Sequence, residues 1–377
     1  MDVEVGAVGH GGVCVAHAPD GRVMLVRHAL PDERVEVVIT EEKKSYLRAD
    51  AVRVLDASAH RVDPPCRFAG PGRCGGCDWQ HVEPAEQRRL KAEVVETALR
   101  RIAGIERAVT VEAVPGDDHG LRWRTRMRLA VGPDGVAGLH RHRSGEIEPI
   151  TDCLIAHPTL PVASVVAERW PDVEAVDLQS TDTAVAVGRS WRIPEGGFWQ
   201  VHPGAPQALA AAVLRYAQAE PADVCLDLYA GVGLFAGALA PLVPDGEVLA
   251  VESNAEAAAA AAENLADVPN VTVIADKVAR WLRRCGADAD IVVLDPPRKG
   301  AGPEVVGDIV ARQPRRVVYV ACEPAALARD IAAFASHGWE LAELSAYDLF
   351  PMTAHVECVA LLAPKPPAAR GVTGQGT

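Results

Sequence analysis

Hydrophobic and polar residues alternate over short stretches in the first part of the chain. Five such stretches are rich in β-branched residues and are separated by glycine, proline or aspartate. They are VEVGAVG, GVCVAH, RVMLVRH, ERVEVVITEE and YLRADAVRVL. A period of two predicts strands that bury one face. Five short strands predict a small barrel of the OB type over residues 1–57, an architecture that often handles oligonucleotides.

The middle of the chain begins with a loop and a helix. Residues 64–80 are dense in Pro, Gly and Cys, and apolar residues then recur with a helical period over about residues 83–103. Residues 121–193 return to short strands. We expect a small β-rich central domain over residues 58–195, whose helix is placed to pack on the domain that follows.

Apolar strands alternate with helix-like segments in the last part of the chain. The strand-like segments are VCLDLYAG, VLAVES, VTVIAD, IVVLDPP and RVVYVAC, with HVECVALLA closing the run. This alternation predicts a parallel, doubly wound α/β domain of the Rossmann type over residues 196–364. The tail of residues 365–377 is polar and rich in Pro and Gly, and we expect it to be disordered.

Composition agrees with a soluble protein of several domains. The 377 residues are 49% hydrophobic and 24% charged, enough to bury a large core. No run of 18 apolar residues predicts a membrane helix, and the N-terminus lacks the pattern of a secretory signal. Nine cysteines, an odd number, argue against a disulfide framework and for the reducing cytoplasm. No feature indicates an obligate protein partner.

The net negative charge of the chain is unevenly distributed along the sequence. Of the net charge of -13, residues 161–377 carry -11. A basic patch lies between residues 122 and 143, where a single acid, Asp134, accompanies six arginines: Arg122, Arg124, Arg126, Arg128, Arg141 and Arg143. Total charge therefore does not exclude a nucleic-acid partner, because phosphate binding depends on where the cations lie.

A glycine turn follows the first strand of the α/β domain. Gly231 lies in this turn, and Glu252 ends the next strand, where a carboxylate can accept both hydroxyls of a ribose. The third glycine of a dinucleotide-binding turn is replaced by Ala236, which favours a nucleoside ligand without pyrophosphate, such as S-adenosylmethionine. Asp276 ends the third strand, where it can either reach the adenine or cap a helix.

Three further strand ends carry residues suited to catalysis. Asp295 precedes two prolines that fix a rigid loop, and a carboxylate at that place points into the ligand crevice of a parallel sheet. Cys322 ends the next strand and is a candidate nucleophile, although most cysteines serve as small buried hydrophobes. Glu357 begins the last strand and is a candidate base. His355, two residues earlier, fits a structural role better.

Four cysteines have the spacing of a metal site. Cys66, Cys74 and Cys77 lie close together in the sequence, and Cys153 lies far downstream. Their thiolates could hold structural zinc or an iron–sulfur cluster. Zinc ribbons have two Cys-x2-Cys pairs, and the first spacing here is too wide for that pattern.

Taken together, these motifs resemble the RNA 5-methyluridine methyltransferase family. The matching stretches, in the family's order, are GFWQVH (197–202), LDLYAGVGLF (226–235), VVLDPPRKG (292–300), YVACEPAALARD (319–330) and FPMTAHVECVALL (350–362). Residues 1–57 resemble the TRAM domain, an OB-like RNA-binding barrel. The chain departs from the family at Glu323, where Asn or Asp usually follows the cysteine.

The resemblance implies a function and assigns roles to these residues. Cys322 would attack C6 of a uracil, so that C5 becomes nucleophilic and takes the methyl group of S-adenosylmethionine. Glu357 would then remove the C5 proton. The resemblance places Asp295 near the methyl donor and the uracil, and makes Gln200, Tyr229 and Glu252 cofactor contacts.

The resemblance also implies a second cofactor and a substrate. It favours a 4Fe-4S cluster on the four cysteines and 23S ribosomal RNA as the substrate, with tRNA as the alternative. Two other classes remain: a small-molecule or protein methyltransferase, which leaves Cys322 and the arginine patch unexplained, and a non-catalytic RNA-binding iron–sulfur protein.

Overall fold

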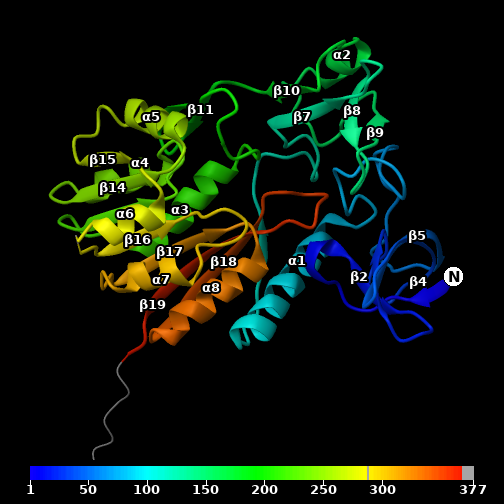
Figure 1. Cartoon of the computed structure of the whole chain (residues 1–377), viewed down its shortest axis with the longest axis horizontal. Helices are drawn as coiled ribbons and strands as arrows, with labels where there is room; N and C mark the ends of the chain where they lie inside the picture. Colours follow the sequence, from blue (N-terminus) through cyan, green and yellow to red (C-terminus); the bar gives the residue numbers. More distant parts are fainter. Residues whose placement is uncertain (287, 367–377) are drawn as a thin grey trace, which may run out of the picture.

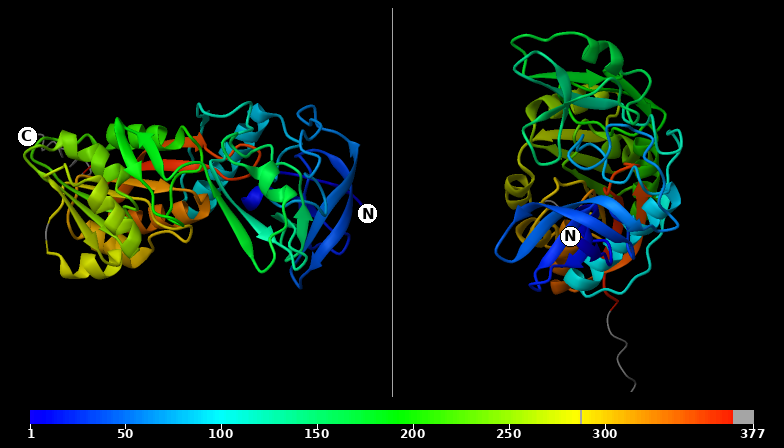
Figure 2. Two further views of the ribbon diagram at one scale, coloured as in Figure 1. Left: turned by 90° about the horizontal axis from the view of Figure 1, so that it is seen from above. Right: turned by 90° about the vertical axis from the view of Figure 1, so that its right-hand side faces the viewer.

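The computed structural model describes residues 1–286 and 288–366. A small β domain lies at the N-terminal end of an elongated molecule, an α/β domain at the other end, and a second β-rich domain above them (Figures 1 and 2). Of the tail expected over residues 365–377, residues 367–377 lie outside the described part. In the part described, no helix is both long and apolar enough to cross a membrane.

The N-terminal domain is one five-stranded sheet, in agreement with the alternating pattern. In the spatial order β1-β4-β5-β3-β2, its strands are β1 (Asp2–Glu4), β4 (Arg34–Glu42), β5 (Tyr46–Asp56), β3 (Val23–Arg27) and β2 (Cys14–His17). Register shifts interrupt the pairing of β4 with β5, and such bulges let a sheet curl over its core. Met24, Val26 and Val35 are fully buried there.

The central domain is a four-stranded antiparallel sheet with a short helix. The order is β10 (Ala175–Gln179), β7 (Arg126–Val131), β8 (Ala137–His140) and β9 (Ile147–Pro149), and the helix is α2 (Val162–Ala167). A separate hairpin of β11 (Thr183–Ala186) and β12 (Arg189–Arg192) leads to the α/β domain.

The α/β domain is built on an eight-stranded sheet. The spatial order is β15 (Val271–Ala275), β14 (Glu247–Glu252), β13 (Val224–Leu228), β16 (Ile291–Leu294), β17 (Arg316–Ala321), β19 (Glu357–Pro364), β18 (Trp339–Asp348) and β6 (Val111–Ala113). Strand β13 pairs in parallel with both β14 and β16, so the strand order reverses there. Ligands of doubly wound sheets bind at the carboxyl ends of strands beside such a reversal.

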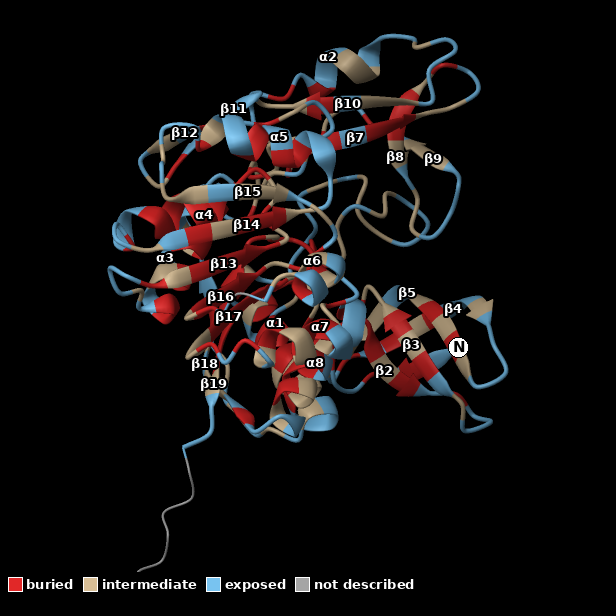
Figure 3. Cartoon of the chain, turned by 60° about the vertical axis from the view of Figure 1, so that its left-hand side comes forward, coloured by how far each residue is buried: buried red, intermediate tan, exposed pale blue. Residues whose placement is uncertain are grey.

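Helices cover both faces of this sheet, and its central strands β13, β16, β17 and β19 are almost wholly buried (Figures 1 and 3). The helices are α3 (Ala205–Ala217), α4 (Leu234–Leu239), α5 (Ala255–Asn264), α6 (Val278–Arg284), α7 (Pro303–Val310) and α8 (Pro324–Ser336). The doubly wound Rossmann-like fold expected from the sequence is therefore confirmed.

The helix expected over residues 83–103 forms and packs against the α/β domain. It consists of α1 (Pro84–Ala98) and a π-helical turn, η2 (Leu99–Ala103), and lies beside α8 (Figure 1). Lys91 on this helix is fully buried; its ammonium bonds the Asp348 carboxylate at 2.5 Å and the Phe350 carbonyl at 3.0 Å. Since β6 also joins the eight-stranded sheet, α1 and β6 are physically part of the α/β layer.

Candidate active site

The glycine turn after β13 has the backbone geometry that its sequence implies. Tyr229, Gly231 and Gly233 all have positive φ, at 64°, 56° and 95°. A positive φ is costly for Tyr229, and such strain concentrates at binding sites. A Cβ on Gly231 would meet nothing within 4 Å, so open space adjoins the turn at this point.

Glu252 fixes the turn from the end of the neighbouring strand. One carboxylate oxygen accepts the Gly231 N–H at 2.9 Å, and the other accepts the Asn254 N–H at 2.7 Å. Each oxygen has a second lone pair, so the carboxylate can still accept ligand hydroxyls. Asp276, at the end of β15, instead accepts the Lys277 N–H at 2.6 Å and pairs with Arg280. Lys277 is the N-cap of helix α6 and makes no side-chain cap bond, so Asp276 binds the backbone just before the helix.

Asp227 is a buried carboxyl that the sequence analysis did not single out. It is 0% exposed; one oxygen accepts the Ala236 N–H at 2.8 Å, while the other has no hydrogen-bond partner in the described part of the chain. Burial raises the pKa of Asp227 to about 7. The signal available beforehand was an aspartate within the apolar strand VCLDL.

The loop that carries Asp295 is held by a second buried aspartate. Asp330, on α8, accepts the N–H groups of Ala301 and Gly302 at 2.7 and 3.2 Å and the Tyr319 hydroxyl at 2.6 Å. Gly300 is required at its position, because a Cβ there would lie 2.6 Å from the Asp330 carboxylate. These bonds fix the end of the loop, directly before α7.

Cys322 and Glu357 lie opposite each other at the end of neighbouring strands. Strands β17 and β19 are antiparallel, with Ala321 paired to Cys358. The ladder ends at this pair, and one step beyond it Cys322 and Glu357 occupy opposite positions, which face the same side of an antiparallel pair. Their proximity agrees with the effect of Glu357 on the pKa of Cys322. Asp295 ends the adjacent parallel strand β16. The structure therefore brings the three candidate catalytic residues to one edge of the sheet.

Burial at this edge raises the pKa of all three groups and so favours their neutral forms. Burial raises the pKa of the Cys322 thiol to about 11, and the neighbouring Glu357 and Asp295 carboxyls add to the shift. Burial also raises the pKa of Asp295 to about 7, and burial beside Asp295 raises that of Glu357 well above its ordinary range. The Arg298 guanidinium acts in the opposite direction on Cys322 and Glu357.

Gln200 lies at a separate hollow, whose lining includes none of Asp295, Cys322 and Glu357. It is 9% exposed and lines a cavity of about 180 Å³ together with Thr125, Arg126 and Trp199. This cavity lies between the α/β domain and the arginine-rich strand β7. His355 packs edge-on against the Phe350 ring, with ring centroids 5.9 Å apart, which agrees with its structural interpretation.

The four candidate metal ligands gather at one cavity of about 260 Å³ in the central domain. The Cys74 sulfur accepts the Gly76 N–H at 3.4 Å and the Cys77 sulfur accepts the Gln80 amide at 3.3 Å. Among residues 1–286 and 288–366, however, no three His, Cys, Asp or Glu side chains are arranged to hold a metal ion. Burial raises the pKa of the Cys77 and Cys153 thiols, and Cys153 packs in the hydrophobic cluster of the central domain.

Half of the arginines in the patch form ion pairs with acids outside residues 122–143. The ion pairs are Arg122–Asp152 (3.1 Å), Arg128–Asp177 (3.1 Å), Arg141–Glu146 (2.8 Å) and Arg141–Glu148 (3.0 Å). The guanidinium groups of Arg124 and Arg126 instead donate to the backbone carbonyls of Arg126 and Gly197. Arg124 also lines the cysteine cavity and Arg126 the Gln200 cavity. Two of the patch's arginines without an ion pair in the described residues, Arg124 and Arg126, therefore lie beside these two cavities, and Arg143 lines another cavity.

Two family models match the chain at its ends. Residues 1–52 match the TRAM domain, and residues 285–365 match the tRNA (uracil-5-)-methyltransferase family. The second match contains the loops that carry Asp295, Cys322 and Glu357.

Similar proteins span almost the whole chain. An uncharacterized RNA methyltransferase of Streptomyces avermitilis is 44% identical over 98% of this chain and 99% of its own length, and one of Corynebacterium efficiens is 33% identical over 97% and 95%. A solved structure, the Pyrococcus abyssi tRNA (uracil-54, C5)-methyltransferase in complex with S-adenosyl-L-homocysteine, has the same fold, with a TM-score of 0.72 over 96% of this chain and 100% of that one, at 22% identity. The chain belongs to the RNA methyltransferase family that joins an N-terminal TRAM domain to a catalytic domain of the tRNA (uracil-5-)-methyltransferase type.

Proposed function

We propose that this protein methylates C5 of a uridine in RNA through a covalent bond between Cys322 and C6 of the base. The observation that carries the proposal is the strand register that sets Cys322 opposite Glu357, beside Asp295 at the reversal of strand order. A thiol nucleophile facing a carboxyl group is what addition followed by elimination requires.

Cys322 and Glu357 perform the bond changes on the uracil. The Cys322 thiol loses its proton to solvent, its thiolate bonds to C6, and the electron pair of the C5=C6 bond moves into the ring as an enolate. C5 then takes the methyl group, whose donor leaves as a neutral thioether. The Glu357 carboxylate removes the C5 proton, the C5=C6 bond re-forms, and the sulfur leaves C6. The raised pKa of Glu357 makes its ionised form a stronger base than an ordinary glutamate.

The methyl donor in this proposal is S-adenosylmethionine, which supplies a methyl group on a positively charged sulfur. The glycine turn at Gly231 and the Glu252 carboxylate would bind its ribose, with Tyr229 and Gln200 as further contacts. Asp295 would lie near the sulfonium, and a positive charge there favours the ionised carboxylate. The open space at Gly231 supports a ligand at this turn. Of the proposed cofactor contacts, Asp276 has the least support, because its carboxylate already accepts a hydrogen bond from the Arg280 guanidinium.

The substrate proposed is RNA, bound along Arg124 and Arg126 and the exposed Arg298 and Lys299 near Cys322. The target base must leave its stack to reach the thiol, at a cost of a few kcal/mol. We favour 23S ribosomal RNA on the sequence resemblance. Transfer RNA is the second candidate, because both the matching family and the Pyrococcus abyssi protein carry tRNA in their descriptions.

The central domain is proposed to hold a 4Fe-4S cluster on Cys66, Cys74, Cys77 and Cys153. The donor set fits, since all four thiols line one cavity and two of them accept N–H bonds of the kind that stabilise a thiolate. Iron binding would require the four thiols to deprotonate and draw together.

Methyl transfer with an identified product tests the function. Purified protein, S-adenosylmethionine and RNA from a strain lacking the enzyme should yield 5-methyluridine, with 23S rRNA and tRNA assayed separately. Cys322→Ala should abolish the product, while Cys285→Ser, at a partly exposed cysteine that ends helix α6, should not. Full methylation by Cys322→Ala would refute the covalent route.

A further inference from the structure

One turn of the N-terminal domain touches the α/β domain next to both proposed catalytic groups. This turn comprises Gly9 and the short 3-10 helix η1 (His10–Gly12). Gly11 and Gly12 both have positive φ, at 74° and 75°, so the chain reverses sharply there. The Gly12 carbonyl accepts the indole N–H of Trp79 at 3.1 Å, and Trp79 is 1% exposed.

Gly12 is packed directly against the loop that leads to Glu357. A Cβ on Gly12 would lie 2.4 Å from the Cβ of Ala354, three residues before Glu357, so only glycine fits. Trp79 donates its backbone N–H to the Met352 carbonyl at 3.0 Å, which fixes the same loop from the other side. Ala354 also packs on a hydrophobic cluster drawn from the N-terminal domain, the following loop and α1: Val8, Leu30, Trp79, Val82, Leu90 and Val94.

His10, on the same turn, reaches the loop that carries Cys322. Its ring Nδ1 lies 3.3 Å from a carboxylate oxygen of Glu323, the residue directly after Cys322. The same oxygen accepts the Ala325 N–H at 3.3 Å and so caps the first turn of α8. Glu323 is where the chain departs from the Asn or Asp of the family. Its side chain is one methylene longer than that of Asp, and this extends its reach toward the neighbouring domain.

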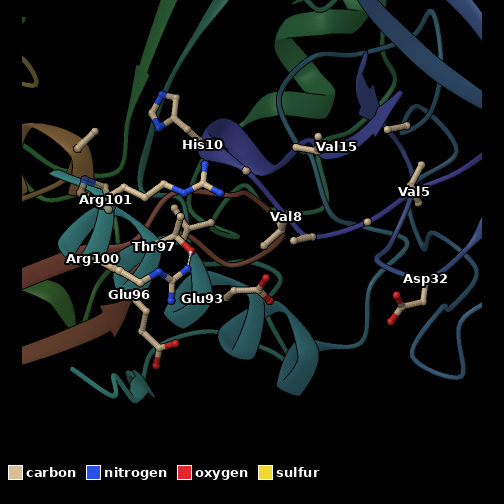
Figure 4. A pocket seen from close by; sticks show the side chains of 18 of the residues that line it. Val5, Val8, His10, Val15, Asp32, Glu93, Glu96, Thr97, Arg100 and Arg101 are labelled. Carbon is tan, nitrogen blue, oxygen red and sulfur yellow. Dashed lines mark hydrogen bonds between the residues drawn. The ribbon is translucent and has the colours of Figure 1, made fainter. Parts of the chain in front are cut away.

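The contact is local, which makes it separable by mutation. Beyond His10 the two domains diverge around a cleft of about 1140 Å³, which ends at Pro324 and Ala325 on the α8 side. Figure 4 shows Val5, Val8 and Val15 of the N-terminal domain on one side of this space and Arg100 and Arg101 on the other.

We propose that the turn of residues 9–12 is a positioning element of the catalytic site. Gly12 sets the loop before Glu357, and His10, acting through Glu323, sets the first turn of α8 behind Cys322. The N-terminal domain thus contributes to the rate of the chemical step, in addition to any contact with RNA. This inference rests on the proposed function of Cys322 and Glu357.

Two neighbouring glycines provide a matched test. Gly11→Ala and Gly12→Ala introduce the same backbone strain, but a Cβ on Gly11 meets nothing within 4 Å. We expect Gly12→Ala to slow the chemical step about tenfold or more relative to Gly11→Ala, with RNA affinity unchanged. Gly12→Ala/Ala354→Gly removes the clashing methyl group and should restore most of the rate. Equal rates in the two single variants, or no rescue, would overturn the role of Gly12.

The second test removes the polar contact, which lies at the surface and does not endanger folding. His10→Ala and Glu323→Gln should each lower kcat about two- to fivefold with KM for RNA unchanged, and the double variant should be no slower than the slower single one. His17→Ala and Glu256→Gln, both at exposed positions, are the controls. Additive losses, or an effect confined to KM, would contradict positioning.

The readout separates this inference from the function on which it rests. RNA transcribed with 5-fluorouridine traps the Cys322 adduct after methyl transfer, because fluorine cannot leave C5 as a proton does. If the unaltered protein forms no adduct, the proposed function fails. If it forms the adduct and the Gly12 and His10 variants form it equally fast, the positioning inference alone fails.

Discussion

The raised pKa of the Cys322 thiol leads to a prediction that can be tested without RNA. With a pKa of about 11, only about a thousandth of this thiol is ionised at pH 8, whereas a thiol at the ordinary value of 9.0 is about one tenth ionised. Alkylation requires the thiolate, so iodoacetamide should modify Cys322 roughly a hundredfold more slowly in the folded protein than in the chain unfolded in urea.

The assay follows the Cys322 peptide by mass spectrometry, because the chain contains eight other cysteines. The dependence on pH identifies the cause. Limited access would lower the rate equally at every pH, whereas a raised pKa makes it rise about tenfold per pH unit from pH 7 to 10 without a plateau.

A variant tests whether the neighbouring carboxyl contributes to the shift. Glu357→Gln removes the ionisable neighbour with the largest electrostatic effect on the thiol, so the pKa of Cys322 should fall and its alkylation at pH 8 should accelerate. A rate profile that levels off below pH 9, or one that Glu357→Gln leaves unchanged, would refute the account of how these two groups interact.

Three further predictions concern stability and RNA binding. Lys91→Met should destabilise the protein to urea by about 3–5 kcal/mol because Asp348 keeps a buried charge, and Lys91→Met/Asp348→Leu should recover most of the loss; no recovery would contradict the buried pair. The pKa of Asp227 is about 7 when folded against an ordinary 3.8, so its contribution to stability is present below pH 4 and is lost as pH rises through 7. Between pH 4 and 7 the free energy of unfolding of Asp227→Asn should therefore rise relative to that of the unaltered protein, by at most about 4 kcal/mol. A difference between the two proteins that does not change with pH would exclude the ionisation of Asp227 as its cause. Replacing Arg124 and Arg126 by Gln should weaken RNA binding and reduce the slope of log affinity against log salt concentration by up to about two. An unchanged slope would mean that RNA binds another surface of the protein.

The sequence could predict the parts of the site that lie at strand ends. Asp295, Cys322 and Glu357 each follow or begin an apolar strand, and a doubly wound sheet brings the carboxyl ends of neighbouring strands to one edge. The sequence could not decide whether Asp276 contacts the adenine or caps a helix, because a carboxylate at a strand end can do either.

Features that depend on pairing between distant segments could not be predicted. Strand β6 is three residues long, and its pairing with β18 has no signal in the local pattern. The arginine count missed Asp152 and Asp177, because those acids approach the patch only through folding. The contact between His10 and Glu323 joins residues more than 300 positions apart.

The central claim is that Cys322 forms a bond to C6 of a uracil, and one measurement tests it most directly. The protein is incubated with S-adenosylmethionine and RNA transcribed with 5-fluorouridine, digested, and searched by mass spectrometry for a peptide linked to a nucleotide. We predict a single crosslinked peptide, attached through Cys322 and carrying one transferred methyl group. Methylation of ordinary RNA without any such crosslink, or a crosslink through another cysteine, would contradict the account.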